Sequence, residues 1–448
     1  MTVTICIIVG VLSVLLFNES AGTLNPGKIN IASYSFYLII IQAYIGCLLI
    51  NCGFNKHYTL GYLLDRRSID TTTYFLWILM LLLPLTMMVV YKLFRFEANR
   101  EYEEYLNKEI EEKDDPTVFY VITVFAVIQL ILLIYYFNEI GYVPLYKLIV
   151  HEAGFEFGTE RIRIQGINLF NSGILTNLLI KLSIPFASYI AAAYMLASKR
   201  TKWGMLALIL FIMSAFVKTI DFSKSPLVFY ALVLVFICIF TKKGGLRAIS
   251  VTVFGGSMAG LLLIVYKLQG YTGSFFDIYN GVIGRTLFTQ FGTLCYHFDL
   301  FPKTFGYLHG RSLTPTVLKI IGIDPKLYLR SGKIVMAFYG SEKVYDGTAG
   351  VMNCLFMGEA YANWGVIGAL LSIIWVGIVI SLLFIAFVRI KKTPVSIAIF
   401  AFLTQLIGNA TQSGFVDFLY NSTIIIVIVI GLLLLYYRKI WEWVRRHN

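Results

Sequence analysis

GVMNCLFMGEAYANWGVIGALL, residues 350–371, carries this chain from a long polar stretch into an apolar helix. Glu359 and Asn363 lie in its first half, and a helix would place both side chains on one face because they are four residues apart. A carboxylate at the mouth of a membrane helix suits a general base, or a partner that orients an arginine. The segment therefore predicts a functional site where the polar stretch meets the membrane.

Composition places the rest of the chain in a lipid bilayer. Hydrophobic residues make up 58% of the 448 residues, charged residues only 14%, and the mean hydropathy is +0.76. A soluble core of this length could not bury so much apolar surface. We therefore expect an all-α polytopic membrane protein that forms one integral membrane domain over residues 1–448.

Apolar windows long enough to cross a bilayer, roughly 20 residues each, recur about 11 times, with a range of 10 to 12. Each window predicts one transmembrane helix. The windows are centred on Val9, Leu38, Leu82, Phe125, Ser183, Leu210, Leu232, Ala259, Ile373, Leu403 and Val427.

Lys and Arg cluster in alternate connections, and cytoplasmic connections carry the excess of these residues. The rule places the 91–116 connection and the C-terminus in the cytoplasm, and the 141–172 loop and the 268–363 stretch in the periplasm. One connection disagrees, because Arg66 and Arg67 lie where alternation predicts the outer face. The net charge of +12 fits this inward bias and attraction to lipid headgroups, so we do not expect nucleic acid as a partner.

Motifs for nucleotides and metals are missing from the sequence. There is no Walker loop, Rossmann glycine motif, HExxH sequence or outer DxD pair, and no cysteine has zinc-ligand spacing. Cys295 and Cys354 both fall in the 268–363 stretch, where an oxidising compartment permits a disulfide, but the sequence leaves their pairing open. We therefore expect no cofactor and no metal, and a substrate that carries its own leaving group.

Two arginines of the 141–172 loop are candidates for binding that leaving group. In GFEFGTERIRIQGINLFNSG, an extended backbone would put Arg161, Arg163 and Gln165 on one face, whereas a helix would separate them. A guanidinium suits phosphate oxygens because it offers several donors in one plane. The alternative is that one of the two pairs with a neighbouring glutamate, Glu156 or Glu160.

The segment FVKTIDFSKSPLVF brings charged residues into a short turn between two apolar windows. Ser225 and Pro226 suit the start of a helix. The positive end of that helix and Lys224 together form a candidate anion site. The alternative is a pair between Lys218 and Asp221, with Lys224 reaching toward headgroups.

Four further polar residues stand beside apolar sequence. Lys181 lies inside the run GILTNLLIKLSIPFASYI, where a charge is costly unless it faces a cavity or a partner, and snorkelling is the alternative. Arg285 and Gln290 lie in GVIGRTLFTQFGTLCYHFDLFP, which predicts an amphipathic helix at the membrane surface. His309, in YLHGRS, is a second candidate base because histidine titrates nearest neutral pH, and a structural role is its alternative.

Several of these segments together resemble a known family. KSP after a short turn, GR followed by Gln and FDLFP, then GRS, and then NCLFMGEAYANWGVIGALL are similar to segments of bacterial oligosaccharide repeat unit polymerases of the O-antigen polymerase (Wzy) type. The resemblance covers topology over the whole chain and local motifs over roughly its second half. GEAYANWG is its most specific piece, whereas the first three predicted helices carry almost no signature.

The resemblance implies a metal-independent glycosyltransferase of the GT-C class in the bacterial inner membrane, with a large periplasmic loop. Such an enzyme moves a growing glycan from undecaprenyl diphosphate onto the terminal sugar of a new lipid-linked repeat unit. It implies Arg161 or Arg163 and Arg285 as functional loop arginines, Lys224 as the Lys of the KSP-like turn, and Glu359 as the Glu of GEAY. Pairing with a polysaccharide chain-length regulator stays open.

The resulting hypothesis combines these residues in one reaction. Arg163, Lys224 and Arg285 would hold the donor diphosphate, while Glu359 or His309 accepts the proton of the attacking hydroxyl. The full set expected to bind the diphosphate or the sugars is Arg161, Arg163, Lys181, Lys224, Arg285, Gln290 and Asn363.

Three alternatives to a polymerase stay open. An O-antigen ligase uses the same donor but transfers finished glycan to lipid A core. A flippase would move the same lipid-linked oligosaccharide across the bilayer, although transporters are usually built from two similar halves, which this sequence does not display. A non-enzymatic membrane scaffold would need none of the candidate residues.

Overall fold

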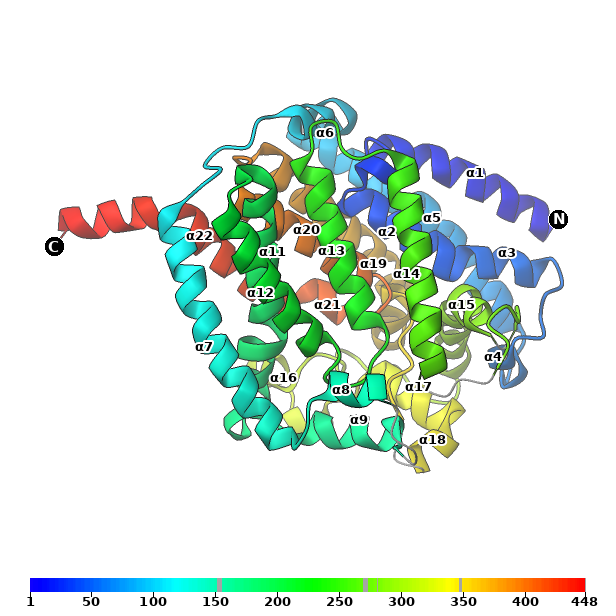
Figure 1. Ribbon diagram of the computed structural model, residues 1–448. Helices are drawn as coiled ribbons and strands as arrows, with labels where there is room; N and C mark the ends of the chain where they lie inside the picture. The colour runs from blue at the N-terminus through cyan, green and yellow to red at the C-terminus, as the bar shows by residue number, and fades with distance from the viewer. Residues whose placement is uncertain (151–154, 269–272, 280, 346–348, 448) are drawn as a thin grey trace.

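The computed structural model describes residues 1–150, 155–268, 273–279, 281–345 and 349–447. Within these residues the chain is all helical, without a strand, and its long helices form one bundle (Figure 1). Nine apolar helices of the described chain are long enough to cross a bilayer. The prediction of an all-α polytopic membrane protein is therefore confirmed, whereas the GT-C class stays a prediction.

The predicted windows correspond to apolar helices of the structure. Each window centre falls inside a helix, and two of the corresponding segments, α13 (Ser225–Thr241) and α20 (Pro394–Ala410), are shorter than the nine long segments. A total of about 11 spans would require both to cross the bilayer, and that total stays a prediction. The nine longer segments are Thr2–Ser20 (α1), Ile31–Asn51 (α2, η2 and α3), Arg67–Phe94 (α5), Pro116–Ile140 (α7), Gly173–Ser198 (α10, η4 and α11), Thr201–Lys218 (α12), Ala248–Leu268 (α14), Phe356–Arg389 (α19) and Val416–Leu434 (α21 and the first part of α22).

Local sequence explains where several helices begin and end. The Asp115 side chain accepts hydrogen bonds from the backbone at the start of α7, whose first residue is Pro116, and the helix ends at Gly141 with φ of 91°. Thr393 and Ser396 form a capping box at the start of α20. Such caps satisfy backbone groups that a helix end leaves unpaired. The remaining helices are α4 (Tyr58–Gly61), α6 (Ala98–Asn107), α8 (Pro144–Val150), α9 (Phe157–Gly166), α15 (Val282–Leu300), α16 (Pro315–Ile320), α17 (Ser331–Tyr339) and α18 (Ser341–Tyr345).

The acidic 91–116 connection, which contains α6, forms ion pairs with basic residues of other connections. These ion pairs include Lys28 with Glu103 (2.6 Å), Arg389 with Glu101 (2.7 Å), Lys202 with Asp114 (2.8 Å), Lys243 with Glu109 (3.2 Å) and Lys391 with Glu111 (3.4 Å). In addition, the buried Lys392 ammonium donates to the carbonyl oxygens of Tyr105 and Leu106 at the end of α6. Connections that the sequence places on one side of the membrane thus lie on one face of the molecule, here called the α6 face.

The described part of the 268–363 stretch covers the opposite face, here called the long-loop face. Asp299 accepts hydrogen bonds there from the backbone N–H groups of Leu64 (2.6 Å) and Asp65 (2.9 Å). Lys303 in turn pairs with Asp65 at 2.8 Å. The connection with Arg66 and Arg67 therefore lies on the long-loop face. Helix alternation predicts this position, whereas the basic residues alone predict the α6 face.

Helix α15 is more deeply buried than its sequence suggests. The prediction of a helix is confirmed, but residues 291–300 are all buried, so the prediction of an amphipathic surface helix is wrong for this half. The buried half packs against α5 and α19, where the ring of Phe298 lies 4.8 Å from Phe75 and 4.4 Å from Tyr361. Only the first half, which carries Arg285, reaches the surface.

Candidate functional site

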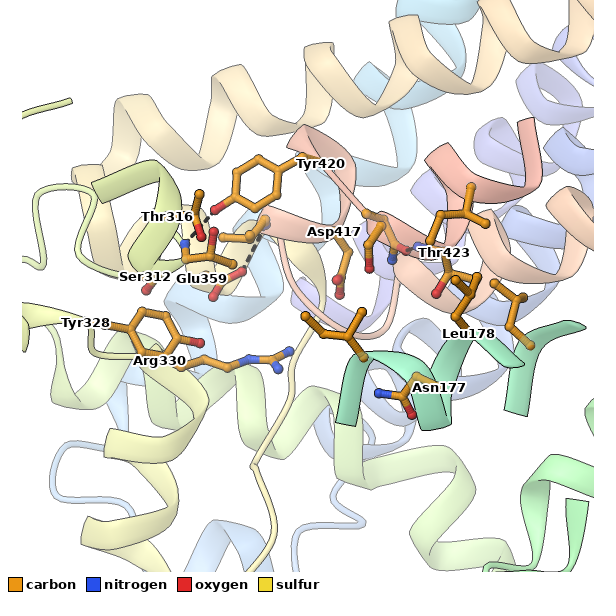
Figure 2. A pocket seen from close by; sticks show the side chains of 17 residues that line it. Asn177, Leu178, Ser312, Thr316, Tyr328, Arg330, Glu359, Asp417, Tyr420 and Thr423 are labelled. Atoms are coloured by element: carbon orange, nitrogen blue, oxygen red, sulfur yellow. Dashed lines mark hydrogen bonds between the residues drawn. The ribbon is translucent and has the colours of Figure 1, made fainter. Parts of the chain in front are cut away.

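A cavity of about 720 Å³ lies on the long-loop face (Figure 2). It is bounded by η4 (Asn177–Leu182), by the long polar stretch and by the connection from α20 to α22 (Ser422–His447). Its volume is in the range typical of small-molecule sites. Three charged side chains, Arg330, Glu359 and Asp417, face it. Hydroxyl, phenol and amide groups cover much of the remaining wall, among them those of Ser312, Thr316, Tyr328, Tyr420, Asn177 and Asn421.

Glu359 reaches this cavity from a broken helix. The backbone of α19 leaves helical geometry at Trp364 and at Gly365, which has φ of 65° and ψ of −152°. Residues 356–363 thus form a short helical segment that precedes the membrane span. The Glu359 side chain is 4% exposed, and its Oε2 accepts a hydrogen bond from the N–H of Val416 at 3.1 Å.

Gly414 lets a second segment approach the Glu359 carboxylate. A Cβ atom at position 414 would overlap the carboxylate oxygen, so a larger residue would displace one of the two segments. The connection between α20 and α22 therefore positions Glu359 through Gly414 and Val416. The same connection supplies Asp417, which begins α21 together with Val416.

Arg330 is the cation of the cavity. Figure 2 shows its side chain entering the same space as Glu359 and Asp417. Its Nη2 donates to the Asn353 side chain at 3.3 Å, and no carboxylate of the described residues lies within the 4.0 Å of an ion pair. The guanidinium nevertheless acts electrostatically on both Glu359 and Asp417. The cavity thus combines a cation with two carboxylates.

The sequence analysis did not select Arg330 or Asp417. Asp417 stands alone in GFVDFLY at the start of the last apolar window, so the reasoning applied to Glu359 could have found it. Arg330 lies in YLRSGK among several other basic residues of the polar stretch, and no local pattern distinguishes it from them.

Asn363 has a structural position beside the cavity. Its side-chain oxygen accepts a hydrogen bond from the N–H of Gly310 at 3.0 Å, and its carbonyl oxygen accepts one from the N–H of His309 at 3.1 Å. Its amide donates to the carbonyl oxygen of Glu359 at 2.8 Å. Asn363 therefore ties the 308–312 loop to the helical segment that carries Glu359.

The two candidate bases occupy different places. Glu359 lines the cavity, whereas His309 is exposed, has φ of 48° and is not among the described residues that line it. The structure thus brings Glu359, but not His309, to the cavity.

Arg161 and Arg163 do not share a face. Residues 157–166 fold as helix α9, which is the conformation in which the sequence separates the two side chains. Arg163 pairs with Glu160 at 2.8 Å and donates to the carbonyl oxygen of Ile140 at 3.0 Å, which is the alternative raised by the sequence. The Tyr142 hydroxyl and Arg163 together lower the pKa of Glu160.

Lys181 lies next to the cavity without lining it. It belongs to the π-helical turn η4 (Asn177–Leu182), and Asn177 and Leu182 of the same turn do line the cavity. The Lys181 side chain is partly exposed, and its carbonyl oxygen accepts a hydrogen bond from Lys218 at 3.4 Å. A π-helical turn changes the direction of the side chains that follow, and here it brings its two ends toward the cavity.

Lys224 lies at a second place, where the Arg285 guanidinium acts on it electrostatically. Helix α13 begins at Ser225 with Pro226 in its first turn, as predicted, and the ammonium of Lys224 lies 3.5 Å from the centroid of the Tyr266 ring. Burial and the nearby Arg285 guanidinium lower the pKa of Lys224 to about 8. Neither cation is among the described residues that line the Glu359 cavity.

Gln290 lies between these two places. It follows Arg285 on α15, and its amide is 3.5 Å from the carbonyl oxygen of Gln412, two residues before Gly414. The side-chain oxygens of Gln290 and Gln412 are buried and have no hydrogen-bond partner in the described part of the chain.

The cysteines of the polar stretch are separate thiols. Cys295 and Cys354 are both buried and free, so the structure contains no disulfide between them. The Cys354 sulfur lies 3.5 Å from Nε2 of His297. Across the described residues, no group of three or more His, Cys, Asp or Glu side chains is placed to hold a metal ion.

Comparison of the chain with models of known families, with curated proteins and with solved structures gives no match. What the cavity can do is therefore inferred from its own residues.

Proposed function

We propose that this protein is a polymerase that joins undecaprenyl diphosphate-linked oligosaccharide repeat units into O-antigen or capsule-type polysaccharide at the periplasmic face of the bacterial inner membrane. The observation that supports it most is the cavity in which Glu359 and Arg330 face hydroxyl-bearing and aromatic side chains at the mouth of membrane helices. Glycosyl transfer from a lipid diphosphate needs a base for the acceptor hydroxyl and a cation for the leaving group. The cavity offers both, together with groups that hydrogen-bond to sugars.

In the proposed reaction, Glu359 accepts the proton of the acceptor hydroxyl as its oxygen attacks the anomeric carbon of the donor. The bond between that carbon and the diphosphate oxygen breaks, and Arg330 stabilises the negative charge of the departing diphosphate. Direct displacement inverts the configuration of the carbon. Asp417 is the second carboxylate of the cavity and interacts with Arg330 electrostatically, without an ion pair at contact distance.

Replacement of Glu359 by Gln tests the base. The variant keeps the size of the side chain and its hydrogen bond from Val416 but does not accept a proton, so we expect at least a ~100-fold loss of polymer. The measurement is the glycan ladder of a host deleted for its own copy and complemented with each variant. Glu342→Gln, an exposed carboxylate of α18, is the matched control.

The type of product separates the alternatives. Single repeat units on the surface support a polymerase, whereas unattached long polymer would identify a ligase. Loss of all surface glycan, including single repeats, would point to a flippase. A normal ladder in both Glu359→Gln and Arg330→Ala would remove this cavity from the chemistry, as a scaffold predicts.

A further inference from the structure

A second junction of polar and apolar surface lies away from the Glu359 cavity. An apolar groove of about 410 Å³ runs between α14 and the start of α15 and shares no lining residue with that cavity. In Figure 1, α14 and α15 stand to the right of α16 and α21, which border the cavity. The groove is formed mainly by Ala259, Leu262 and Leu263 of α14 and by Val282, Ile283 and Leu287 of α15.

Two cations lie next to residues of this groove without lining it themselves. Arg285 lies on the same helical turn as Val282, Ile283 and Thr286, which all line the groove. Lys224 reaches it through Tyr266, one turn beyond Leu263 on α14. The ring of Tyr266 also lies 6.4 Å from Phe275, another lining residue.

No carboxylate of the described residues lies within 4.0 Å of Lys224 or of Arg285. Burial of Lys224, together with repulsion by the Arg285 guanidinium, lowers the pKa of Lys224 to about 8. An anion between them would relieve the repulsion, so the pair is suited to a negatively charged ligand.

An apolar groove beside paired cations matches an amphiphile with an anionic head and an apolar chain. The oxygens of a diphosphate accept charge-assisted hydrogen bonds from ammonium and guanidinium groups. A single groove takes one chain, as an isoprenoid diphosphate has, rather than the two acyl chains of a phospholipid.

The reaction proposed above contains two such lipids, and their geometry tells them apart. The donor diphosphate is bonded to the carbon that is attacked, so it must enter the Glu359 cavity, where Arg330 lies. The acceptor diphosphate is bonded to the opposite end of a repeat unit from the attacking hydroxyl. It must therefore sit away from Glu359, as Lys224 and Arg285 do.

We propose that Lys224, Arg285 and the α14–α15 groove bind the isoprenoid diphosphate anchor of the acceptor, which stays intact during the reaction. This assignment rests on the proposed function. The sequence analysis expected Lys224 and Arg285 to bind the donor diphosphate, which is the leaving group. In this proposal they bind the acceptor diphosphate, which remains attached to the product.

Photolabelling tests the binding site without any need for polymerase activity. The full-length protein in phosphatidylcholine nanodiscs is exposed to undecaprenyl diphosphate with a photoreactive group in its chain, and labelled peptides are identified by mass spectrometry. We expect label on α14 and α15, and about tenfold less label in Lys224→Ala/Arg285→Ala because charge-assisted hydrogen bonds are lost. Leu263→Trp, which fills the groove, should have the same effect.

Control variants keep the result interpretable. Lys224→Arg/Arg285→Lys retains both charges and should retain the label, which excludes general misfolding as the cause. Lys319→Ala removes an exposed charge of the same face and should change nothing. Unchanged labelling in Lys224→Ala/Arg285→Ala, or equal displacement by phosphatidylglycerol, would overturn the site.

Kinetics assign the lipid to the acceptor. With purified donor and acceptor lipids, Lys224→Ala should raise the KM for the acceptor and leave kcat and the KM for the donor unchanged. A rise in the donor KM instead would return Lys224 to the donor. If no variant or wild-type protein forms polymer, the polymerase proposal fails while the labelling result still stands. If labelling fails but Glu359→Gln abolishes polymer, only the groove assignment is withdrawn.

Discussion

Charged side chains of the long-loop face divide into those with a partner in the chain and those without one. Arg163 is paired with Glu160, and Lys303 with Asp65. Within the described residues, Arg330 has no carboxylate at ion-pair distance. A cation without an acidic partner is free to bind a substrate anion, so pairing matters more than the presence of an arginine in a loop.

Lys224 makes anion binding at the second site depend on pH. Its pKa is about 8 in the free protein, with Tyr266 and Arg285 as the groups that face it, and a bound anion would raise that pKa. The affinity for undecaprenyl diphosphate should therefore be full below pH 8 and fall as the pH rises above 8. The guanidinium of Arg285 keeps its charge over this range.

Binding measured between pH 7 and pH 9.5 checks this expectation. Lys224→Arg should remove the fall, because a guanidinium stays charged throughout. Identical pH profiles for the wild-type protein and Lys224→Arg would show that the Lys224 charge does not contribute.

At the scale of elements, the break in α19 determines how Glu359 is presented. A continuous helix over 356–389 would keep one direction from the cavity into the membrane, whereas the break at Trp364 and Gly365 lets residues 356–363 take their own direction. The sequence predicted the helix but not the break, because a glycine within a helix leaves its backbone conformation to the surrounding contacts.

Substitutions in the connection between α20 and α22 should reduce the proposed activity as strongly as substitutions in the segment that carries Glu359. Gly414→Ala would place a methyl group on the Glu359 carboxylate, and a displacement of about 1 Å can reduce a rate by ~100-fold. We expect a matching loss of polymer with normal amounts of protein in the membrane. Gly306→Ala is the control, since a Cβ there meets no other atom within 4 Å. Full ladders in Gly414→Ala would show that Glu359 does not need this position.

Helix α15 shows why an amphipathic pattern is ambiguous. Its polar residues His297 and Asp299 suggest an exposed face, but both are buried. Asp299 accepts hydrogen bonds from Leu64 and Asp65, and His297 Nδ1 lies 2.8 Å from the carbonyl oxygen of Thr293. Polar side chains are tolerated inside when such partners are available, and partners from distant segments are not visible in a local pattern.

At the scale of the whole molecule, charge separates the two faces. On the α6 face, the acidic 91–116 connection forms ion pairs with basic residues of four other connections. These ion pairs fix the positions of the basic side chains. On the long-loop face, polar segments cover the ends of the helices and enclose the cavity. The arrangement agrees with the alternation of connections predicted from Lys and Arg.

Lys392 should be the residue on which the α6 face depends most. Its buried ammonium donates to two carbonyl oxygens at the end of α6. Lys392→Met would leave both without a partner, which costs about 1–3 kcal/mol of unfolding free energy. Thermal unfolding of the purified protein should show a lower midpoint, whereas Lys242→Met, an exposed lysine of the same face, should not. Equal midpoints would mean that water replaces the ammonium.

The sequence by itself determined the helical membrane class, the windows that become helices, and the place of Glu359 at the mouth of one of them. These properties depend on hydrophobicity and spacing within a single segment, so they can be read locally. Only the tertiary structure decided that Arg330 and Asp417 line one cavity with Glu359. It also showed that Arg163 forms an ion pair with Glu160, and that Arg285 acts electrostatically on Lys224 at a second place. The residues of the cavity, and Lys224 with Arg285, come from segments far apart in the chain that helix packing brings together. The pair of Arg163 with Glu160 is local, and it depends on the helical conformation of residues 157–166.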